Sequence, residues 1–360
     1  MSERLNPYRG LPSFQYWRSG VADIGLGQFD PVEAVKFQIG ESDQISTLGS
    51  CFAQHLAKHI HKSGYNYLVT EPLRSDEEQT DMAVMMASQF SARYGNVYTV
   101  RQALQLLDRA NGWEPKDSIW ERDDRFYDAF RPNVFPGGFA SKELLIEERK
   151  RHLESVQKVF TQSDVVVFTL GLTETWMSLQ DGAVYPVAPG VVAGSLDESQ
   201  HAFKNFNYTE VMSDLTAWCI RLQEMNPKVR ILLTVSPVPL NATYEPKNVW
   251  TSTTYSKATL RSAAGDVASA LPYVDYFPSY EIITCPQVQG RYFEDDLREV
   301  KEIGVRHVMR VFGKHYLAKS EAAEAAEVVE QKRRFSFGRS SRSAGVSSVF
   351  CDEELLDQEE

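Results

Sequence analysis

Cysteines are few in this sequence, and none of them stand close together. Four occur in 360 residues, at positions 51, 219, 285 and 351, and no two of them form a CxxC pair. This spacing argues against a zinc knuckle and against a dithiol redox motif. Widely separated cysteines are typical of free thiols in a reducing compartment, so we expect a cytoplasmic protein.

An excess of basic residues and long apolar runs are also missing. The 38 Lys and Arg residues are outnumbered by 49 Asp and Glu residues, which gives a net charge of −11. Nucleic-acid binding needs a basic face toward the phosphates, so we expect no nucleic-acid partner. Apolar runs such as 165–172 are too short to span a bilayer. We therefore expect no membrane association. The first residues lack the apolar stretch of a secretory signal, so we expect no such signal there.

Apolar residues recur at two alternating periodicities along most of the chain. Short apolar, β-branched runs predict buried strands at 43–49, 164–170, 229–235 and 273–277. Helical spacing predicts helices at 51–63, 81–92, 99–110, 142–160, 208–225, 254–270 and 300–312, with a long loop at 171–207. Buried strands that alternate with helices indicate an α/β fold, a three-layer α/β/α sandwich with a mostly parallel sheet.

Composition separates one large domain from its flanking segments. We expect an N-terminal arm at 1–40 that packs on the body and a domain at 41–318. The stretch 111–150 is rich in Trp, Asp, Pro and Gly, which predicts an inserted cap over one face. Residues 319–334 are rich in Ala and Glu, as in a helical extension. Residues 335–360 are basic and Ser-rich, then acidic, which predicts a disordered tail that is either solvated or bound by a protein partner.

The residues that follow the predicted strands form the candidate site, because ligands bind at the carboxyl ends of strands in such sheets. Ser50 follows Gly49 and precedes a helix, so its hydroxyl is expected in the cleft near free N–H groups of the helix. Two alternatives stay open. Ser50 belongs to the residue types favoured as helix N-caps, and the adjacent Cys51 is a second nucleophile, although a small buried thiol is a commoner role.

Three other candidate site residues lie after the central strand or later in the chain. Glu174 is a candidate to orient an imidazole or to bind substrate, with a helix-cap or ion-pair role as the alternative. His201 lies in the polar loop that leaves the same sheet edge, so it can reach the cleft. Lys257 is a candidate for binding an anionic group, and a solvated or structural lysine is the alternative.

The segment 49–53 reads GSCFA, and the chain resembles the bacterial branch of the GSCFA family. Further motifs resemble the family in their order and spacing: NPYRGLPSFQYWRSG, SARYGNVYTVRQALQL, FTLGLTETW, LLTVSPVPL, TYSKATLRSA and VDYFPSYEII. The resemblance spans about residues 6–312 and leaves out the tail. The family is regarded as similar to SGNH/GDSL-type hydrolases, which are three-layer α/β/α esterases and acyl-group transferases with a serine nucleophile.

The resemblance implies roles for individual residues. Ser50 matches the nucleophile. Gly95, with Asn96 beside it, matches the glycine whose N–H contributes to the oxyanion hole together with the N–H of Ser50. The Gly-x-Asn-Asp block corresponds to 171–174, where Thr173 replaces the asparagine. Thr173 or Asn96 would then have to supply the missing donor.

The general base is open between two residues. The Asp-x-x-His block of the family corresponds to 296–299, where Asp296 is retained and Glu299 replaces the histidine. A carboxylate, with an ordinary pKa near 4.3, is a weak base at neutral pH unless burial raises that pKa. An imidazole is better matched to neutral pH. We therefore prefer His201, oriented by Asp296 or Glu174, and expect it within hydrogen-bond distance of the Ser50 hydroxyl.

Together these residues predict a Ser-dependent esterase or O-acyltransferase that acts on acyl groups of a carbohydrate or similar small substrate through an acyl-enzyme. The alternative is an inactive fold that serves as a carbohydrate- or protein-binding module, which Thr173 and Glu299 at the replaced positions favour. No cofactor is expected. His55 and His59 share a helix face, but no HExxH pattern or third ligand accompanies them, so we expect no metal.

Overall fold

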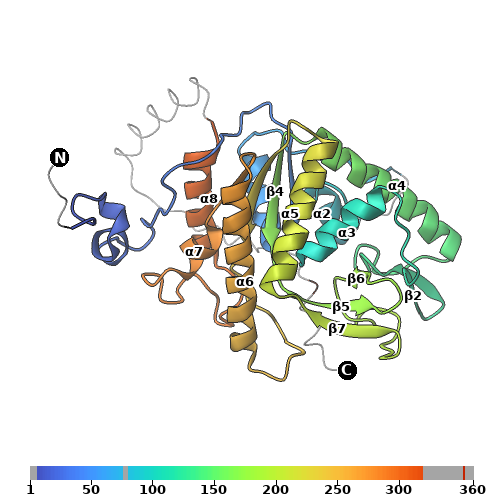
Figure 1. Cartoon of the computed structure of the whole chain (residues 1–360). Coiled ribbons are helices and arrows are strands. Elements are labelled where there is room, and N and C mark those ends of the chain that lie inside the picture. Colours follow the sequence, from blue (N-terminus) through green and yellow to red (C-terminus); the bar gives the residue numbers. More distant parts are fainter. Residues whose placement is uncertain (1–5, 76–79, 319–351, 353–360) are drawn as a thin grey trace.

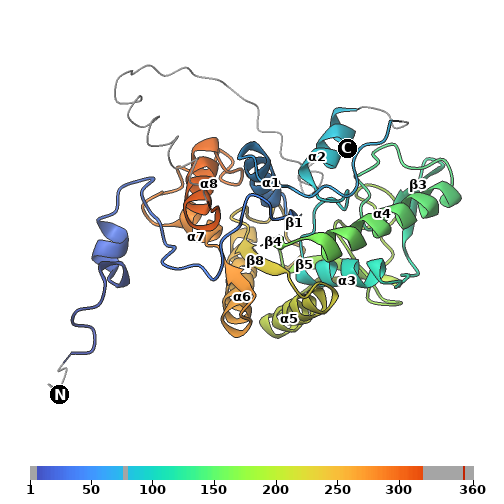
Figure 2. The ribbon, with the colours of Figure 1, turned by 90° about the horizontal axis from the view of Figure 1, so that it is seen from above.

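A four-stranded parallel sheet forms the centre of the molecule. The computed structural model describes residues 6–75, 80–318 and 352. The sheet has the order β1-β4-β8-β9, with strands β1 (Ile45–Gly49), β4 (Val165–Leu170), β8 (Arg230–Val235) and β9 (Val274–Tyr276). Helices lie on both faces of this sheet (Figure 1, Figure 2). The expected three-layer α/β/α architecture is therefore confirmed.

Side chains that alternate along the strands pack into two separate cores. In β4, Val166 and Phe168 pack against one helical layer, whereas Val165 and Val167 pack against the other. Because both faces are covered, every residue of β4 is buried, and the strand is a continuous apolar run. The first layer holds α3 (Val100–Ala110), α4 (Lys142–Gln162), α5 (Tyr208–Met225) and α6 (Val249–Ala270), and the second holds α1 (Phe52–Lys62), α7 (Ser279–Thr284) and α8 (Glu302–Tyr316).

Polar residues fix the starts of several helices. The side chains of Thr99 and Ser141 accept hydrogen bonds from backbone N–H groups at the starts of α3 and α4. Asn207 and Glu210 form a capping box at the start of α5. Asn248 caps α6, which therefore begins five residues earlier than the expected 254. A short helix, α2 (Asp81–Gln89), lies between α1 and α3 and is capped by Thr80.

The stretch 171–207, expected to be a loop, contains a second sheet instead. In it β5 (Glu174–Ser178) pairs antiparallel with both β6 (Val184–Tyr185) and β7 (His201–Asn205). The hairpin of β2 (Ile119–Arg122) and β3 (Arg125–Asp128), which belongs to the insertion at 111–150, packs on this sheet. The rings of Trp120 and Tyr185 lie 5.1 Å apart between their centroids. Where a loop was expected, a three-stranded sheet thus packs against the hairpin through aromatic side chains.

The N-terminal stretch contacts the body near residues 29–39. The N–H of Ile39 donates to the carbonyl of Tyr316, and His307 Nε2 lies 2.7 Å from the carbonyl oxygen of Phe29. Two short helical turns before it, η1 (Ser13–Gln15) and η2 (Arg18–Ala22), bury none of their residues. The predicted helical extension at 319–334 lies outside the described residues. So does the predicted tail at 335–360, except for Asp352, which is buried within the domain.

Candidate functional site

Ser50 lies at the carboxyl end of β1, directly before α1, as the sequence predicts. The preceding Gly49 has a φ of +130°, and a Cβ at this position would lie 2.2 Å from the carbonyl oxygen of Thr169. On the other side, a Cβ at Gly171 would lie 2.9 Å from the Cβ of Ser50. Two glycines therefore let β1 and β4 close tightly around Ser50, and side chains at either place would displace it.

The Ser50 hydroxyl is buried and has no hydrogen-bond partner among the described residues. It does not cap α1, because Cys51 is the N-cap residue and no side chain caps this helix. The N–H of Ser50 donates to the carbonyl of Thr169 at 3.1 Å, so this N–H is not available for an oxyanion, contrary to the expectation. A buried hydroxyl without a partner is uncommon in folded proteins and requires an explanation.

The segment 94–98 runs beside Ser50 and carries the expected oxyanion donors. The N–H of Val97 donates to the carbonyl of Gly49 at 2.8 Å, and the N–H of Gly171 donates to the carbonyl of Tyr98 at 3.1 Å. Gly95 has a φ of +69°, which suits glycine, and Asn96 is buried. The Asn96 Oδ1 accepts a hydrogen bond from Gln54 Nε2 of α1. Val97 and Tyr98 thus hold the segment that carries Gly95 and Asn96 beside Gly49 and Gly171.

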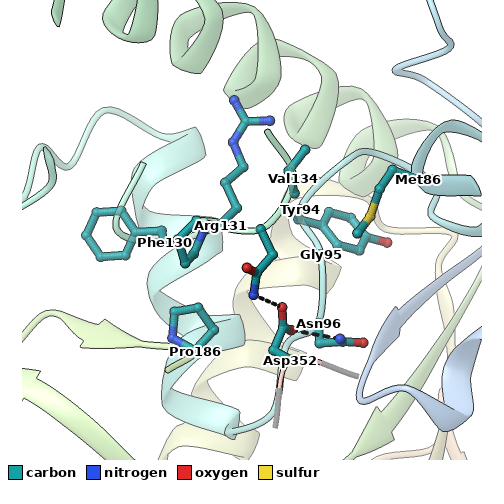
Figure 3. A pocket seen from close by; sticks show the side chains of 11 residues that line it. Met86, Tyr94, Gly95, Asn96, Phe130, Arg131, Val134, Pro186 and Asp352 are labelled. Atoms are coloured by element: carbon teal, nitrogen blue, oxygen red, sulfur yellow. Dashed lines mark hydrogen bonds between the residues drawn. The ribbon is translucent and has the colours of Figure 1, made fainter. Parts of the chain in front are cut away.

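Asp352, from the end of the chain, binds to the Asn96 side chain (Figure 3). Asn96 Nδ2 donates to Asp352 Oδ2 at 2.8 Å, and Asn133 Nδ2 donates to Asp352 Oδ1 at 2.5 Å. The hydroxyl of Tyr98 lies 3.3 Å from Asp352 Oδ2 and accepts the N–H of Asp352 at 3.0 Å. Sequence reasoning missed Tyr98, Asn133 and Asp352, since they come from three distant segments.

Thr173 does not replace the missing asparagine donor. It is fully buried, and its hydroxyl donates to Asn205 Oδ1 at 2.7 Å. Its N–H donates to Ser256 Oγ of α6 at 3.1 Å. The hydroxyl proton is already engaged, so Thr173 cannot donate it to an oxyanion. Through these two hydrogen bonds, Thr173 instead joins β7 and α6 to the end of β4. Asn205 and Ser256 are further residues that the sequence analysis did not single out.

The structure does not bring His201 to Ser50. His201 begins β7, opposite Ser178, whereas Asn205 at the other end of β7 contacts Thr173. The four steps between them span about 13 Å of extended strand. His201 Nε2 lies 2.7 Å from Asp117 Oδ2, and Nδ1 accepts the N–H of Asp197. With both ring nitrogens engaged, this buried imidazole connects the hairpin insertion to the second sheet.

Replacing His201 by alanine should therefore leave the reactivity of Ser50 unchanged. The variant should lose about 1–3 kcal/mol of unfolding free energy, because Asp117 loses a buried partner. Urea unfolding measures the stability, and the rate of fluorophosphonate labelling measures the reactivity. A loss of labelling of about a hundredfold or more, the usual contribution of a general base, would show that His201 does serve Ser50.

Glu174 lies at the start of β5, half-buried and away from His201. Its carboxylate accepts hydrogen bonds from the Thr243 hydroxyl at 2.8 Å and from the N–H of Tyr244 at 3.4 Å. Desolvation by burial raises the pKa of Glu174, although these two hydrogen bonds oppose the shift. It does not orient the His201 ring, contrary to the expectation. Instead, Glu174 lies beside the edge-packed rings of Trp176 and Tyr244, whose centroids are 4.8 Å apart, in a cavity of about 290 Å³.

Three other expected residues share a larger cavity at the same sheet edge. Lys257, Asp296 and Glu299 line a cavity of about 970 Å³, together with residues of the β8–α6 connection. Lys257 is buried, and its Nζ donates to the carbonyl of Gly171 at 2.8 Å. Asp296 and Glu299 are exposed, and Asp296 accepts the N–H of Glu299. Lys257 therefore links the lining of this cavity to Gly171, which contacts Ser50.

A buried charge network supports the two segments that carry the donors. The Glu71 carboxylate lies 2.7 Å from His152 Nδ1 and 3.5 Å from both Arg93 and Arg131. Burial by itself raises the pKa of Glu71, but His152, Arg131 and Arg93 outweigh burial and lower this pKa to about 2. Arg131 also donates to the carbonyl of Arg93, which joins the segment of Asn133 to the segment of Asn96.

The chain matches one protein family and, at low similarity, several solved structures. The model of the GSCFA family matches residues 44–312, so the chain belongs to the GSCFA family. No curated protein matches the chain. A carbohydrate esterase family 3 protein from Talaromyces cellulolyticus is 11% identical, with a TM-score of 0.36, and the match covers 80% of this chain and 99% of that one.

Two further solved structures show a similar likeness. A protein assigned as a GDSL-like lipase from Parabacteroides merdae is 13% identical, with a TM-score of 0.32, over 77% of this chain and 97% of that one. An acetyl xylan esterase from the rumen bacterium Butyrivibrio proteoclasticus is 11% identical, with a TM-score of 0.28, over 82% and 65%. Within residues 6–75 and 80–318, no helix is long and apolar enough to cross a membrane. The described part of the chain also has no cluster of three or more His, Cys, Asp or Glu side chains placed to bind a metal ion.

Proposed function

We propose that the protein is a Ser-dependent esterase or O-acyltransferase that acts on acyl groups of a carbohydrate or similar small substrate. The Ser50 hydroxyl carries this proposal. It lies at the junction of a parallel strand and a helix, between two glycines, and no described group binds it. Membership of the GSCFA family supports the same role. Cys51, beside it, is buried at the helix start and is not the proposed nucleophile.

The reaction would pass through an acyl-enzyme. The Ser50 oxygen attacks the carbonyl carbon of the ester, and a base takes the hydroxyl proton. The bond from that carbon to the leaving alcohol breaks, and the alcohol takes up the proton. Water, or the hydroxyl of an acceptor, then attacks the acyl-enzyme and releases Ser50. Gly95 and Asn96 are the proposed oxyanion donors, because they belong to the segment 94–98, which hydrogen-bonds Gly49 and Gly171 through Val97 and Tyr98.

The proposed general base is Glu299, with Asp296 beside it. These residues line the cavity that also contains Lys257, and Lys257 binds the carbonyl of Gly171 next to Ser50. The cavity volume of about 970 Å³ falls within the range of small-molecule sites. The adjacent rings of Trp176 and Tyr244 offer flat apolar surfaces with a carboxylate nearby, which suits the faces and hydroxyls of a sugar.

We propose that the protein is cytoplasmic, because it has cysteines that form no disulfide bond. Cys219 and Cys285 are both buried and form no disulfide bond. Free thiols persist in reducing compartments. This location is consistent with a small intracellular ester as the substrate.

A second candidate function is a binding module without catalysis. One observation favours it: in the described part of the chain, no imidazole lies within hydrogen-bond distance of Ser50. In that case the cavity lined by Lys257, Asp296 and Glu299 would bind a carbohydrate or a protein segment without cleaving it. The two functions differ in whether Ser50 is activated.

A fluorophosphonate probe tests this difference, because it labels serines that an enzyme site activates. The folded chain should be labelled at Ser50, and Ser50→Ala should abolish the label. Ser236→Ala, which changes a buried serine directly after β8, should retain it. The Asp352→Ala variant is tested in parallel, since Asp352 binds one of the proposed donors. If Ser50 is labelled neither in the native chain nor in Asp352→Ala, the result favours the binding module.

A further inference from the structure

Asp352 is a buried carboxylate, and among the described residues only neutral groups hydrogen-bond it. It is 4% exposed, and its oxygens accept hydrogen bonds from the amides of Asn96 and Asn133 and from the hydroxyl of Tyr98. In residues 6–75 and 80–318, no Lys, Arg or His side chain hydrogen-bonds this carboxylate. Taking a carboxylate out of water without a cation is costly, so the donors must be well placed to hold it.

A cation lies nearby but binds elsewhere. Arg131 lines the same pocket, yet its guanidinium points away from Asp352 (Figure 3). That guanidinium is engaged with Asp128 and Glu71. Burial raises the pKa of Asp352, although the hydrogen bonds from Asn133, Asn96 and Tyr98 oppose the shift. A pocket of neutral donors suits the partly charged oxygen of an acyl group as well as a full carboxylate.

These donors adjoin the proposed nucleophile. Asn96 and Tyr98 belong to the segment that hydrogen-bonds both Gly49 and Gly171, the two flanks of Ser50. Gln54, in the first turn of the helix that follows Ser50, holds the oxygen of the Asn96 amide. This contact leaves the amide nitrogen of Asn96 to point at the bound carboxylate. The carboxylate of Asp352 therefore occupies a polar site on the segment that hydrogen-bonds the two glycines around Ser50.

We propose that Asn96, Tyr98 and Asn133 form the acyl-binding subsite of the catalytic centre, and that the chain fills this subsite with its own Asp352. The inference rests on the proposed function, because it assigns the subsite to the ester. Its ligands are a small carboxylic acid, the product of hydrolysis, and the acyl group of the ester. The end of the chain then competes with substrate for the site.

Competition from within the same chain has a defined consequence. A tethered group acts at an effective concentration that can reach the millimolar range. The apparent affinity for a free ligand falls in proportion to the fraction of molecules with an open site. Replacing Asp352 by alanine removes the internal carboxylate, so a free carboxylate should bind this variant more tightly than the native chain.

Sodium acetate is the probe, and the shift in melting temperature of the full-length chain is the readout. Binding to the folded state raises the melting temperature in proportion to RT ln(1 + [L]/Kd). Acetate should stabilise Asp352→Ala at least about twice as much as it stabilises the native chain, with sodium chloride at equal ionic strength as the reference. Adding Asn133→Ala to Asp352→Ala should remove this extra stabilisation. Asp357→Ala, which removes another carboxylate of the same C-terminal sequence, should behave like the native chain.

Hydrogen exchange at the amide of Asp352 in the native chain gives a second measurement. The N–H donates to Tyr98, so its exchange should be slowed about tenfold or more, and Asn133→Ala should reduce this protection. Equal acetate shifts in Asp352→Ala and the native chain, or exchange at the rate of a free peptide, would overturn the subsite. If acetate distinguishes the variants but fluorophosphonate labels neither, the subsite stands and the proposed esterase function fails. If Ser50 is labelled equally in the native chain and in Asp352→Ala, and acetate stabilises both to the same extent, the proposed esterase function stands and the subsite fails.

Discussion

Ester turnover should fall at least about a thousandfold when Ser50 is replaced by alanine, because the acyl-enzyme can no longer form. The fold should remain intact. The Ser50 hydroxyl makes no hydrogen bond among the described residues and does not cap α1, so its removal breaks no stabilising contact. We expect the unfolding free energy to change by no more than about 0.5 kcal/mol. Hydrolysis of p-nitrophenyl acetate and urea unfolding measure the two quantities.

Ser46→Ala is the matched control for this substitution. Ser46 is also buried and lies in β1, the strand that ends just before Ser50, but its hydroxyl forms a hydrogen bond of 2.7 Å with the Ser163 hydroxyl. Its loss should cost about 1 kcal/mol of stability and leave turnover per folded molecule unchanged. The opposite pattern, with turnover kept and about 0.5–2 kcal/mol lost in Ser50→Ala, would show that Ser50 has only a helix-capping role.

Glu71→Ala should lower the unfolding free energy by about 3–5 kcal/mol, because it leaves Arg93 and Arg131 as buried charges without their shared partner. The folded-state pKa of Glu71, about 2, lies below the ordinary value of 4.5. The charged form therefore stabilises the native chain above pH 4.5, and this contribution is lost as the pH falls toward 2. The difference between native and variant should be largest near pH 7 and should shrink toward pH 3.

An exposed ion pair provides the comparison for Glu71. Glu121 pairs with Lys142 on the surface, where both side chains are more than half exposed. Glu121→Ala should cost less than about 1 kcal/mol, with no comparable pH dependence. Denaturant unfolding of the two variants at several pH values tests the contrast. Equal losses in both variants would contradict the role assigned to the buried network.

The sequence predicts the central sheet well because each strand is encoded locally. The run from 165 to 170 is apolar on both faces, and all six of its residues are buried. The second sheet was missed for the opposite reason. Most of the residues of β5 and β7 are only partly buried, and β6 has two residues, so no periodic apolar pattern marks these strands. Helix α7, with six residues, is also too short to show such a pattern.

The residues of the candidate site also differ in whether their positions are encoded locally. Ser50 could be predicted because a strand, a glycine and a helix follow one another in the sequence. The position of His201 could not, because it depends on the pairing of β7 with β5, which sets His201 opposite Ser178. The contact of Asp352 with Asn96 joins segments far apart in the chain, and nothing in the composition of an acidic tail specifies its partner.

The glycine contacts of Ser50 also determine when the site can exist. Gly49 and Gly171 come from strands β1 and β4, and α1 to α4 lie between these strands in the sequence. Pairing of distant parallel strands is slow, because closing the large loop between them costs conformational entropy before the contacts of the paired strands can stabilise it. A nascent or partly folded chain that contains the GSCFA segment therefore holds an ordinary exposed serine there. Reactivity at Ser50 should arise late in folding, together with the central strand pair.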